Sequence, residues 1–321
     1  MNVISNADMR FGIAIPQVFL DGHADMTLVT RVLQRAEHLG YESAWVQDQV
    51  IGETALLESV SLLSYAAAVT ARIRLGVSVI VYPVRNPVQL AKSFSTLDHL
   101  SNGRAILGIG LGPPAVAENF YRSFGTEYGQ RVRRFTEGLA IMRSLWSNET
   151  TTVDGEFFQL NATRMEPKPV QQPLPVWFGG QHPDALKRAA LLSDGYMGAG
   201  PTTTSEFAEH VAQLRAALDE SGRDPAEVPV SKRVYLALDD DADRAKRRLD
   251  EFFEERYPWM IQQNPDFVAD ICCWGSAEQV AEGLREVRDA GAEMIVLNPL
   301  WDFVDQYEHL AADVLPLVRS P

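Results

Sequence analysis

Short apolar segments alternate with longer amphipathic segments along almost the whole chain. Brief runs rich in Val, Ile and Leu predict buried strands, whereas apolar residues spaced three and four apart predict helices. The predicted strands are residues 10–15, 43–46, 75–81, 105–110, 176–178, 196–199, 230–238 and 294–297. The predicted helices are residues 25–39, 57–71, 87–100, 132–146, 183–192, 204–221 and 277–290, with one more after the acidic run at 239–241 and a C-terminal tail helix.

About eight strands, each followed by a helix, predict a parallel α/β fold. A closed (β/α)8 TIM barrel and a doubly wound open sheet both fit this alternation. The strand count and the length of 321 residues favour the barrel, which takes about 250 residues. We predict a single domain, residues 1–321, with insertions at about 112–130, 150–175 and 257–274. Asp154-Gly155 predicts a hairpin in the second insertion.

The most informative segment is the β-α-β unit at residues 74–112. Asn86 and Pro87 suit the start of its helix. Its second strand ends in the glycine-rich run 108–112, at the end of a strand where α/β folds bind ligands. A dinucleotide-binding fingerprint needs a third glycine at position 113, which is Pro113, so the Rossmann interpretation is disfavoured. The glycines fit either a tight turn or a flat ring lying against the backbone.

Composition narrows the class of protein. The net charge of −14 argues against nucleic-acid binding, and no apolar run approaches the roughly 20 residues that span a bilayer. The N-terminus lacks a signal-peptide pattern. Cys272 and Cys273 are adjacent and suit two reduced thiols rather than a disulfide or a metal site. We therefore expect a cytoplasmic protein that binds no metal, nucleic acid or membrane.

Several motifs, in a shared order, resemble the luciferase-like monooxygenase superfamily, most closely its coenzyme F420-dependent branch. The resemblance extends from about residue 10 to 318. It implies a TIM barrel, a flavin or deazaflavin cofactor and a homodimer. The motifs that carry it are residues 11–16, 36–48, Arg85-Asn86-Pro87, 100–104, 108–112, 155–158, 166–171, 177–180, 189–196 and 275–280.

The resemblance also implies where the cofactor lies. The family holds a non-prolyl cis peptide in its third strand, which would fall at Ser78-Val79 and support the ring. The residues expected at the ring are Val77, Ser78, Val79, Gly110, Leu111 and Gly112. Residues 179–184 form a glycine-rich strand exit at a helix start, which is typical of an anion site. The residues expected at the cofactor phosphate are Gly179, Gly180, Gln181 and His182, although a turn beside a surface histidine fits the same residues.

Two positions depart from the F420-dependent branch. Relatives have Ser-Asp-His after the second strand, whereas this chain has Gln47-Asp48-Gln49. We expect Asp48 at the cofactor, and Asp48 and Gln49 in catalysis, although glutamine cannot exchange a proton as histidine does. A solvated loop carboxylate or a helix cap also fits Asp48. Where the sugar-phosphate dehydrogenases place an acid after the last glycine, this chain has Pro113-Pro114. Glu118 is the candidate substitute, and the change argues against glucose 6-phosphate as substrate.

We therefore expect an F420-dependent oxidoreductase that transfers a hydride to or from a small organic substrate. One alternative is an FMN-dependent monooxygenase that uses O2 and a separate flavin reductase. Another is a non-catalytic flavin-binding barrel. Fold alone does not separate these three functions.

Overall fold

The protein is described by a computed structural model that covers residues 9–19, 22–52, 54–112 and 117–319. In these residues parallel strands close into a barrel, because β1 pairs with β12 and β9 pairs with β10. The barrel strands in spatial order are β1 (Arg10–Ala14), β2 (Ser43–Val46), β3 (Arg74–Val77) continued by β4 (Ile80–Val81), β5 (Ala105–Gly110), β8 (Val176–Gly179), β9 (Tyr196–Gly198), β10 (Val230–Leu238) and β12 (Met294–Pro299). This is the predicted (β/α)8 TIM barrel.

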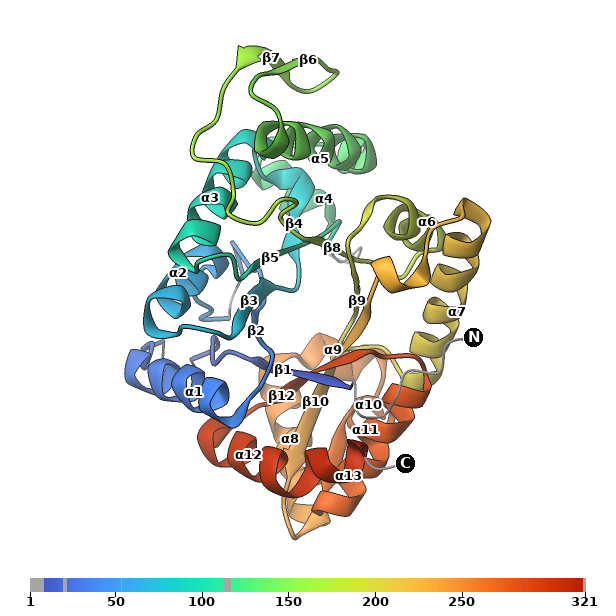
Figure 1. The fold of residues 1–321 in the computed structure, drawn as a ribbon. Coiled ribbons are helices and arrows are strands. Elements are labelled where there is room, and N and C mark those ends of the chain that lie inside the picture. The colour runs from blue at the N-terminus through green and yellow to red at the C-terminus, as the bar shows by residue number, and fades with distance from the viewer. Residues whose placement is uncertain (1–8, 20–21, 53, 113–116, 320–321) are drawn as a thin grey trace.

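Helices surround the strands on the outside of the barrel (Figure 1). They bury their apolar faces against the strands and leave polar faces in water. These helices are α1 (Met26–Leu39), α2 (Ser59–Val69), α3 (Pro87–Leu100), α5 (Arg131–Ser147), α6 (Pro183–Leu192), α7 (Thr204–Ser221), α8 (Ala242–Arg256), α11 (Ala277–Asp289), α12 (Phe303–His309) and α13 (Leu315–Arg319). Asn86 accepts from the backbone N–H groups of Val88 and Gln89, so it caps α3 as predicted.

The long connections carry short elements of their own. The segment after β5 holds α4 (Ala117–Ser123), and the segment after α5 holds the hairpin β6 (Thr151–Asp154) and β7 (Gln159–Thr163). The segment after α8 holds α9 (Pro258–Gln263) and α10 (Phe267–Ile271). It ends in β11 (Cys273–Gly275), which pairs with β10. The sequence patterns did not predict β11, which lies at the end of the segment expected to form the third insertion.

Two tryptophan rings fill the inside of the barrel. Trp45 and Trp177 lie with ring centroids 5.6 Å apart, and Met197 and Val296 belong to the same buried cluster. A Cβ atom on Gly76 would lie 2.3 Å from the Trp45 ring, so only glycine leaves room for that ring. The interior is therefore a packed core, and ligands have access only to the mouth of the barrel.

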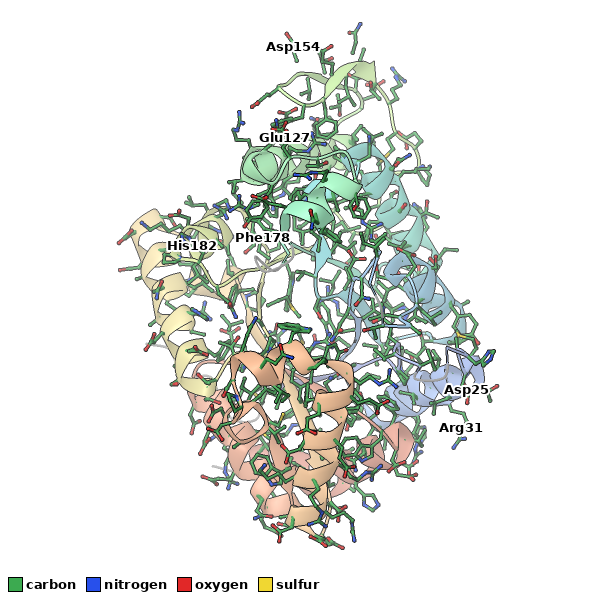
Figure 2. The ribbon with its side chains drawn as sticks, turned by 180° about the vertical axis from the view of Figure 1, so that it is seen from behind. Asp25, Arg31, Glu127, Asp154, Phe178 and His182 are labelled. Carbon is green, nitrogen blue, oxygen red and sulfur yellow. The ribbon has the colours of Figure 1, made fainter. Side chains whose placement is uncertain are left out.

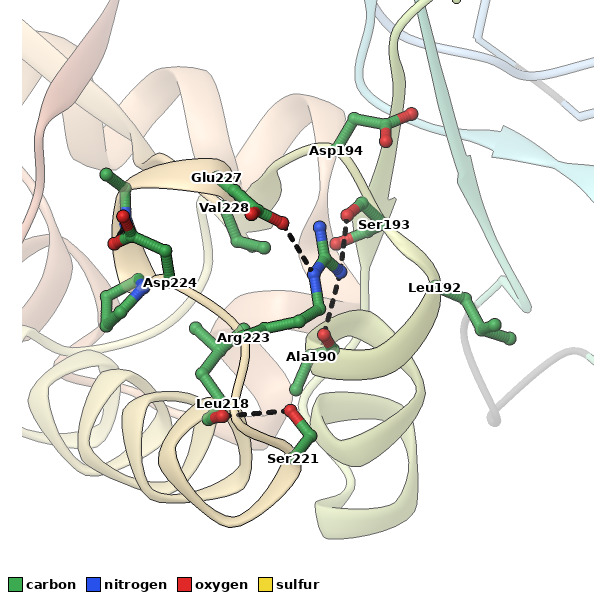
Figure 3. Close-up of polar contacts among 12 residues, drawn as sticks. Ala190, Leu192, Ser193, Asp194, Leu218, Ser221, Arg223, Asp224, Glu227 and Val228 are labelled. Atoms are coloured by element: carbon green, nitrogen blue, oxygen red, sulfur yellow. Dashed lines mark hydrogen bonds and ion pairs between the residues drawn. The ribbon is translucent and has the colours of Figure 1, made fainter.

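The Arg223 side chain binds the end of a helix on the outside of the barrel. Arg223 Nη1 donates to the carbonyl oxygens of Ala190 and Ser193, at 2.8 and 3.0 Å, and its Nε pairs with Glu227 at 3.1 Å (Figure 3). The last carbonyl groups of a helix have no partner within the helix. Arg223 thus fixes the end of α6, and with it the start of the next strand.

Candidate active site

A cavity of about 900 Å³ opens at the carboxyl ends of the barrel strands. This is the end that carries the active sites of TIM-barrel enzymes. Its walls come from the ends of β2, β4, β5, β8 and β10, from the start of α6, and from α5, α9 and α10. Figure 2 shows two of the residues at this mouth, Phe178 at the end of β8 and His182 before α6, whereas Asp154 lies away from them in the hairpin.

The predicted third strand is interrupted at the mouth. The Ser78–Val79 peptide is cis, as the family resemblance implied, and it separates β3 from β4. The Val79 side chain lies over two neighbouring strands. A Cβ atom on Gly110 would come within 2.7 Å of Val79 Cγ2, and one on Gly179 within 3.1 Å of Val79 Cγ1. Packing against Val79 therefore explains these two glycines without a ligand.

Asp48 lies at the edge of the cavity with its carboxylate already engaged. It forms an ion pair with Arg85 at 2.7 Å. It also accepts from Ser59 Oγ at 3.0 Å and from the Val81 N–H at 3.2 Å. The Asp48 side chain is 2% exposed. These contacts join the ends of β2 and β4 to the start of α2. Asp48 therefore holds these elements in position at the mouth of the barrel.

Three of the expected residues do not line this cavity. Gln49 lies in the loop after β2, where its Nε2 faces the Thr54 carbonyl oxygen at 3.4 Å. Glu118 is exposed on α4, and Val77 is buried in the hydrophobic core. Pro113 and Pro114 lie outside the described residues. The roles expected of Gln49, Glu118 and Val77 stay predictions, as does the catalytic role of Asp48.

The other expected residues do line the cavity. They are Ser78, Val79, Gly110, Leu111, Gly112, Gly179, Gly180, Gln181 and His182. His182 caps α6, because its Nδ1 accepts from the Asp184 N–H at 3.2 Å. Gly180 has a φ of +156°, and a Cβ atom there would lie 2.8 Å from Ala185 Cβ. The structure thus brings together the strand exit and the helix start that the sequence proposed as an anion site.

Two arginines extend the positive charge at this end of the cavity. Arg131 stacks on the Tyr128 ring at 3.8 Å and lines the wall with Arg188. Burial lowers the pKa of Arg188, with nearby Asp184 acting in the opposite direction and Arg131 in the same direction. No sequence pattern had indicated a role for Arg188, which lies five residues into α6 on the side of the cavity. A guanidinium group can hold a phosphate through two parallel hydrogen bonds.

Another part of the lining carries four apolar side chains beside the polar Gln263 and Asn264. Trp259 and Met260 come from α9, and Phe267 and Ile271 come from α10. Such a wall suits an organic ring or chain.

Sequence reasoning missed the two polar residues of β10 that reach the cavity, Arg233 and Tyr235. Both lie within a strand that is buried almost throughout. A signal for Arg233 was available, because burying a charged residue in an apolar strand costs free energy unless the charge is paired or functional. The described residues contain no group of three His, Cys, Asp or Glu side chains that could hold a metal ion.

Comparison with known proteins agrees with this fold. Residues 9–294 match the family described as luciferase-like monooxygenase. The chain belongs to this family. No helix in the described part of the chain is long and apolar enough to cross a membrane.

Two relatives are enzymes with named activities. The chain is 33% identical over 221 residues to an F420-dependent glucose-6-phosphate dehydrogenase of Kineococcus radiotolerans, covering 66% of this chain and 64% of that protein. It is 30% identical over 211 residues to a 5,10-methylenetetrahydromethanopterin reductase of Methanolobus tindarius, covering 66% of this chain and 61% of that protein. These matches span less than two thirds of each relative's length.

A solved structure supports the fold. An F420-dependent secondary alcohol dehydrogenase superimposes with a TM-score of 0.83, covering 97% of this chain and 99% of that one. At 20% sequence identity this likeness concerns the fold alone.

Proposed function

We propose that this protein is an F420-dependent oxidoreductase that transfers a hydride between the deazaflavin and a small organic substrate. The observation that carries the proposal is the 33% identity to an F420-dependent dehydrogenase over 221 residues, two thirds of this chain. F420, when bound, would accept or supply the hydride.

The residues of the cavity fit such a cofactor. Ser78, Val79 and Gly110 line the mouth of the barrel, where they would support a ring. The start of α6, with Arg131 and Arg188, offers hydrogen-bond donors and positive charge for the anionic side chain. The apolar side chains of α9 and α10 would exclude water from the reacting atoms. Asp48 would keep β4 in place beneath the ring through the Val81 N–H.

The second candidate is an FMN-dependent monooxygenase with a separate flavin reductase. Gln49 favours it, because this chain lacks the strand-2 histidine of the F420-dependent branch. A non-catalytic flavin-binding barrel is the third. A homodimer, implied by the family resemblance, and a cytoplasmic location, expected from the sequence patterns, belong to the same proposal and can be tested by light scattering and cell fractionation.

The test is a fluorescence titration of the apo-protein with F420 and, separately, with FMN. We expect F420 to bind at least tenfold more tightly than FMN. Arg131→Met and Arg188→Met should each weaken F420 binding about tenfold, the size of one charged hydrogen bond. Arg143→Met is the matched control, because Arg143 lies outside the cavity lining and donates to the Leu192 carbonyl oxygen. Tighter FMN binding would support the monooxygenase, and binding of neither would refute both.

A further inference from the structure

Arg233 crosses the mouth of the barrel. It lies in β10, which is four strands away from β3 in either direction around the ring of strands. Its Nη2 nevertheless donates to Ser78 Oγ, at the end of β3, over 2.5 Å. The side chain therefore spans the barrel from one side to the other. Its guanidinium group lies at the floor of the cavity, near the barrel axis.

The charge of Arg233 has no counter-ion among the described residues. The side chain is 5% exposed. Its hydrogen bonds go to two neutral oxygens, Ser78 Oγ and, at 3.4 Å, Asn298 Oδ1. Burial lowers the pKa of Arg233, with nearby tyrosines acting in the opposite direction. A guanidinium has five N–H donors, so this group keeps unused donors beside the cavity.

Arg104 shows how the same fold satisfies an arginine that has a structural role. It is 8% exposed, and it also lacks a carboxylate partner among the residues described. Its donors reach the carbonyl oxygens of Ser101, Ile73, Ala67 and Thr70 and the Thr70 hydroxyl, at 2.6 to 3.2 Å. Arg104 thus completes the end of a helix. Arg233 makes no comparable set of bonds and lines a cavity instead.

Tyr235 adds a second donor on the same face of β10. It lies two residues after Arg233, so both side chains point to the barrel interior. The ring packs edge-on against Phe253, at 5.3 Å between centroids, and is 7% exposed. Its hydroxyl has no hydrogen-bond partner in the described part of the chain and lines the cavity. The hydroxyl is therefore free to donate a hydrogen bond to a ligand in the cavity.

We propose that Arg233 and Tyr235 bind an anionic oxygen of the substrate, and that the substrates are small carboxylates with an apolar body. The carboxylate would lie on Arg233 at the cavity floor, and the apolar body would contact Trp259, Met260 and Phe267. The identification of this ligand as the substrate rests on the proposed function. The anion site itself does not.

Calorimetric titration of the apo-protein with sodium benzoate and with its neutral analogue benzamide tests the site. We expect benzoate to bind at least tenfold more tightly than benzamide. Arg233→Met should remove that preference, Arg233→Lys should restore part of it, and Tyr235→Phe should weaken benzoate binding about tenfold, as for one hydrogen bond to a charged group. Equal binding of the two probes to the wild type, or an unchanged preference in Arg233→Met, would overturn the proposal.

Thermal unfolding of the same variants separates binding from a structural role. Because the buried charge lacks a counter-ion, Arg233→Met should melt no lower than the wild type. A lower melting temperature with unchanged benzoate binding would make Arg233 structural and overturn the proposal.

Titrations with F420 distinguish a failure of the anion site at Arg233 from a failure of the proposed F420-dependent function. If benzoate binding depends on Arg233 but F420 does not bind, only the proposed cofactor is wrong. If saturating F420 displaces benzoate and Arg233→Met weakens F420 binding tenfold, the anionic oxygen belongs to the cofactor, and the substrate assignment is overturned.

Discussion

Asp48→Asn tests whether this carboxylate positions the barrel mouth or acts in catalysis alone. In the wild type the carboxylate is 2% exposed and accepts hydrogen bonds from Arg85, Ser59 and the Val81 N–H. Removing one partner of a buried ion pair costs about 3–5 kcal/mol. Asparagine keeps the shape and one acceptor oxygen, and the Arg85 side chain is 23% exposed. We therefore expect a loss near the lower limit, about 3 kcal/mol.

The assay is urea unfolding followed by circular dichroism, with the free energy taken from the midpoint and the slope. The matched control is Glu149→Gln. Glu149 pairs with Arg164 at the same distance of 2.7 Å, but the two side chains are 77% and 66% exposed. Exposed pairs contribute about 0–1 kcal/mol, so the control should unfold at nearly the wild-type midpoint.

A double-mutant cycle with Arg85→Met isolates the pair. Once Arg85 is replaced, Asp48→Asn no longer leaves a buried charge without its partner. The loss of stability in the double mutant should therefore be smaller than the sum of the two single losses, by about 1–3 kcal/mol. The reasoning is refuted if Asp48→Asn changes stability by less than about 0.5 kcal/mol, below the value of one hydrogen bond, while abolishing turnover. That result would assign Asp48 to catalysis alone.

Three further predictions use the same unfolding assay. Gly108→Ala should lose about 3 kcal/mol, because the new Cβ would lie 2.0 Å from the Val77 carbonyl oxygen. Gly129→Ala, with nothing within 4 Å, should change stability by less than about 1 kcal/mol. Arg104→Met should lose about 3 kcal/mol or more, since it leaves buried carbonyl groups without donors, and a loss below about 1 kcal/mol would contradict this. Burial lowers the pKa of Lys232 to about 8, below its unfolded value of about 10.5. The unfolded state then binds more protons between these pH values, so wild-type stability should rise by up to about 3 kcal/mol relative to Lys232→Met from pH 8 to about 10.5. A constant difference between the two proteins would refute the buried-lysine argument.

Local signals in the sequence were sufficient for the elements and for much of the mouth. The spacing of apolar residues, the helix caps and the glycine-rich strand ends each depend on residues that are close together in the sequence. They can therefore be recognised from the sequence alone. The barrel strands, the Asn86 cap and the meeting of residues 110–112 with residues 179–182 at one cavity were all predicted and found. The family resemblance implied a cis peptide at Ser78-Val79, which no local pattern in the sequence could show and which the structure has.

The sequence could not determine which polar groups would meet across the barrel. Arg233 reaches Ser78 over a separation of 155 residues, and Asp48 finds Arg85 over 37. Neither pairing leaves a local pattern, because both depend on barrel closure and on which face of each strand turns inward. Val79 packing over Gly110 and Gly179 has the same cause. Local chemistry in the sequence therefore determined the barrel and its ligand-binding end, whereas only the tertiary structure decided which side chains reach the ligand and which are held by one another.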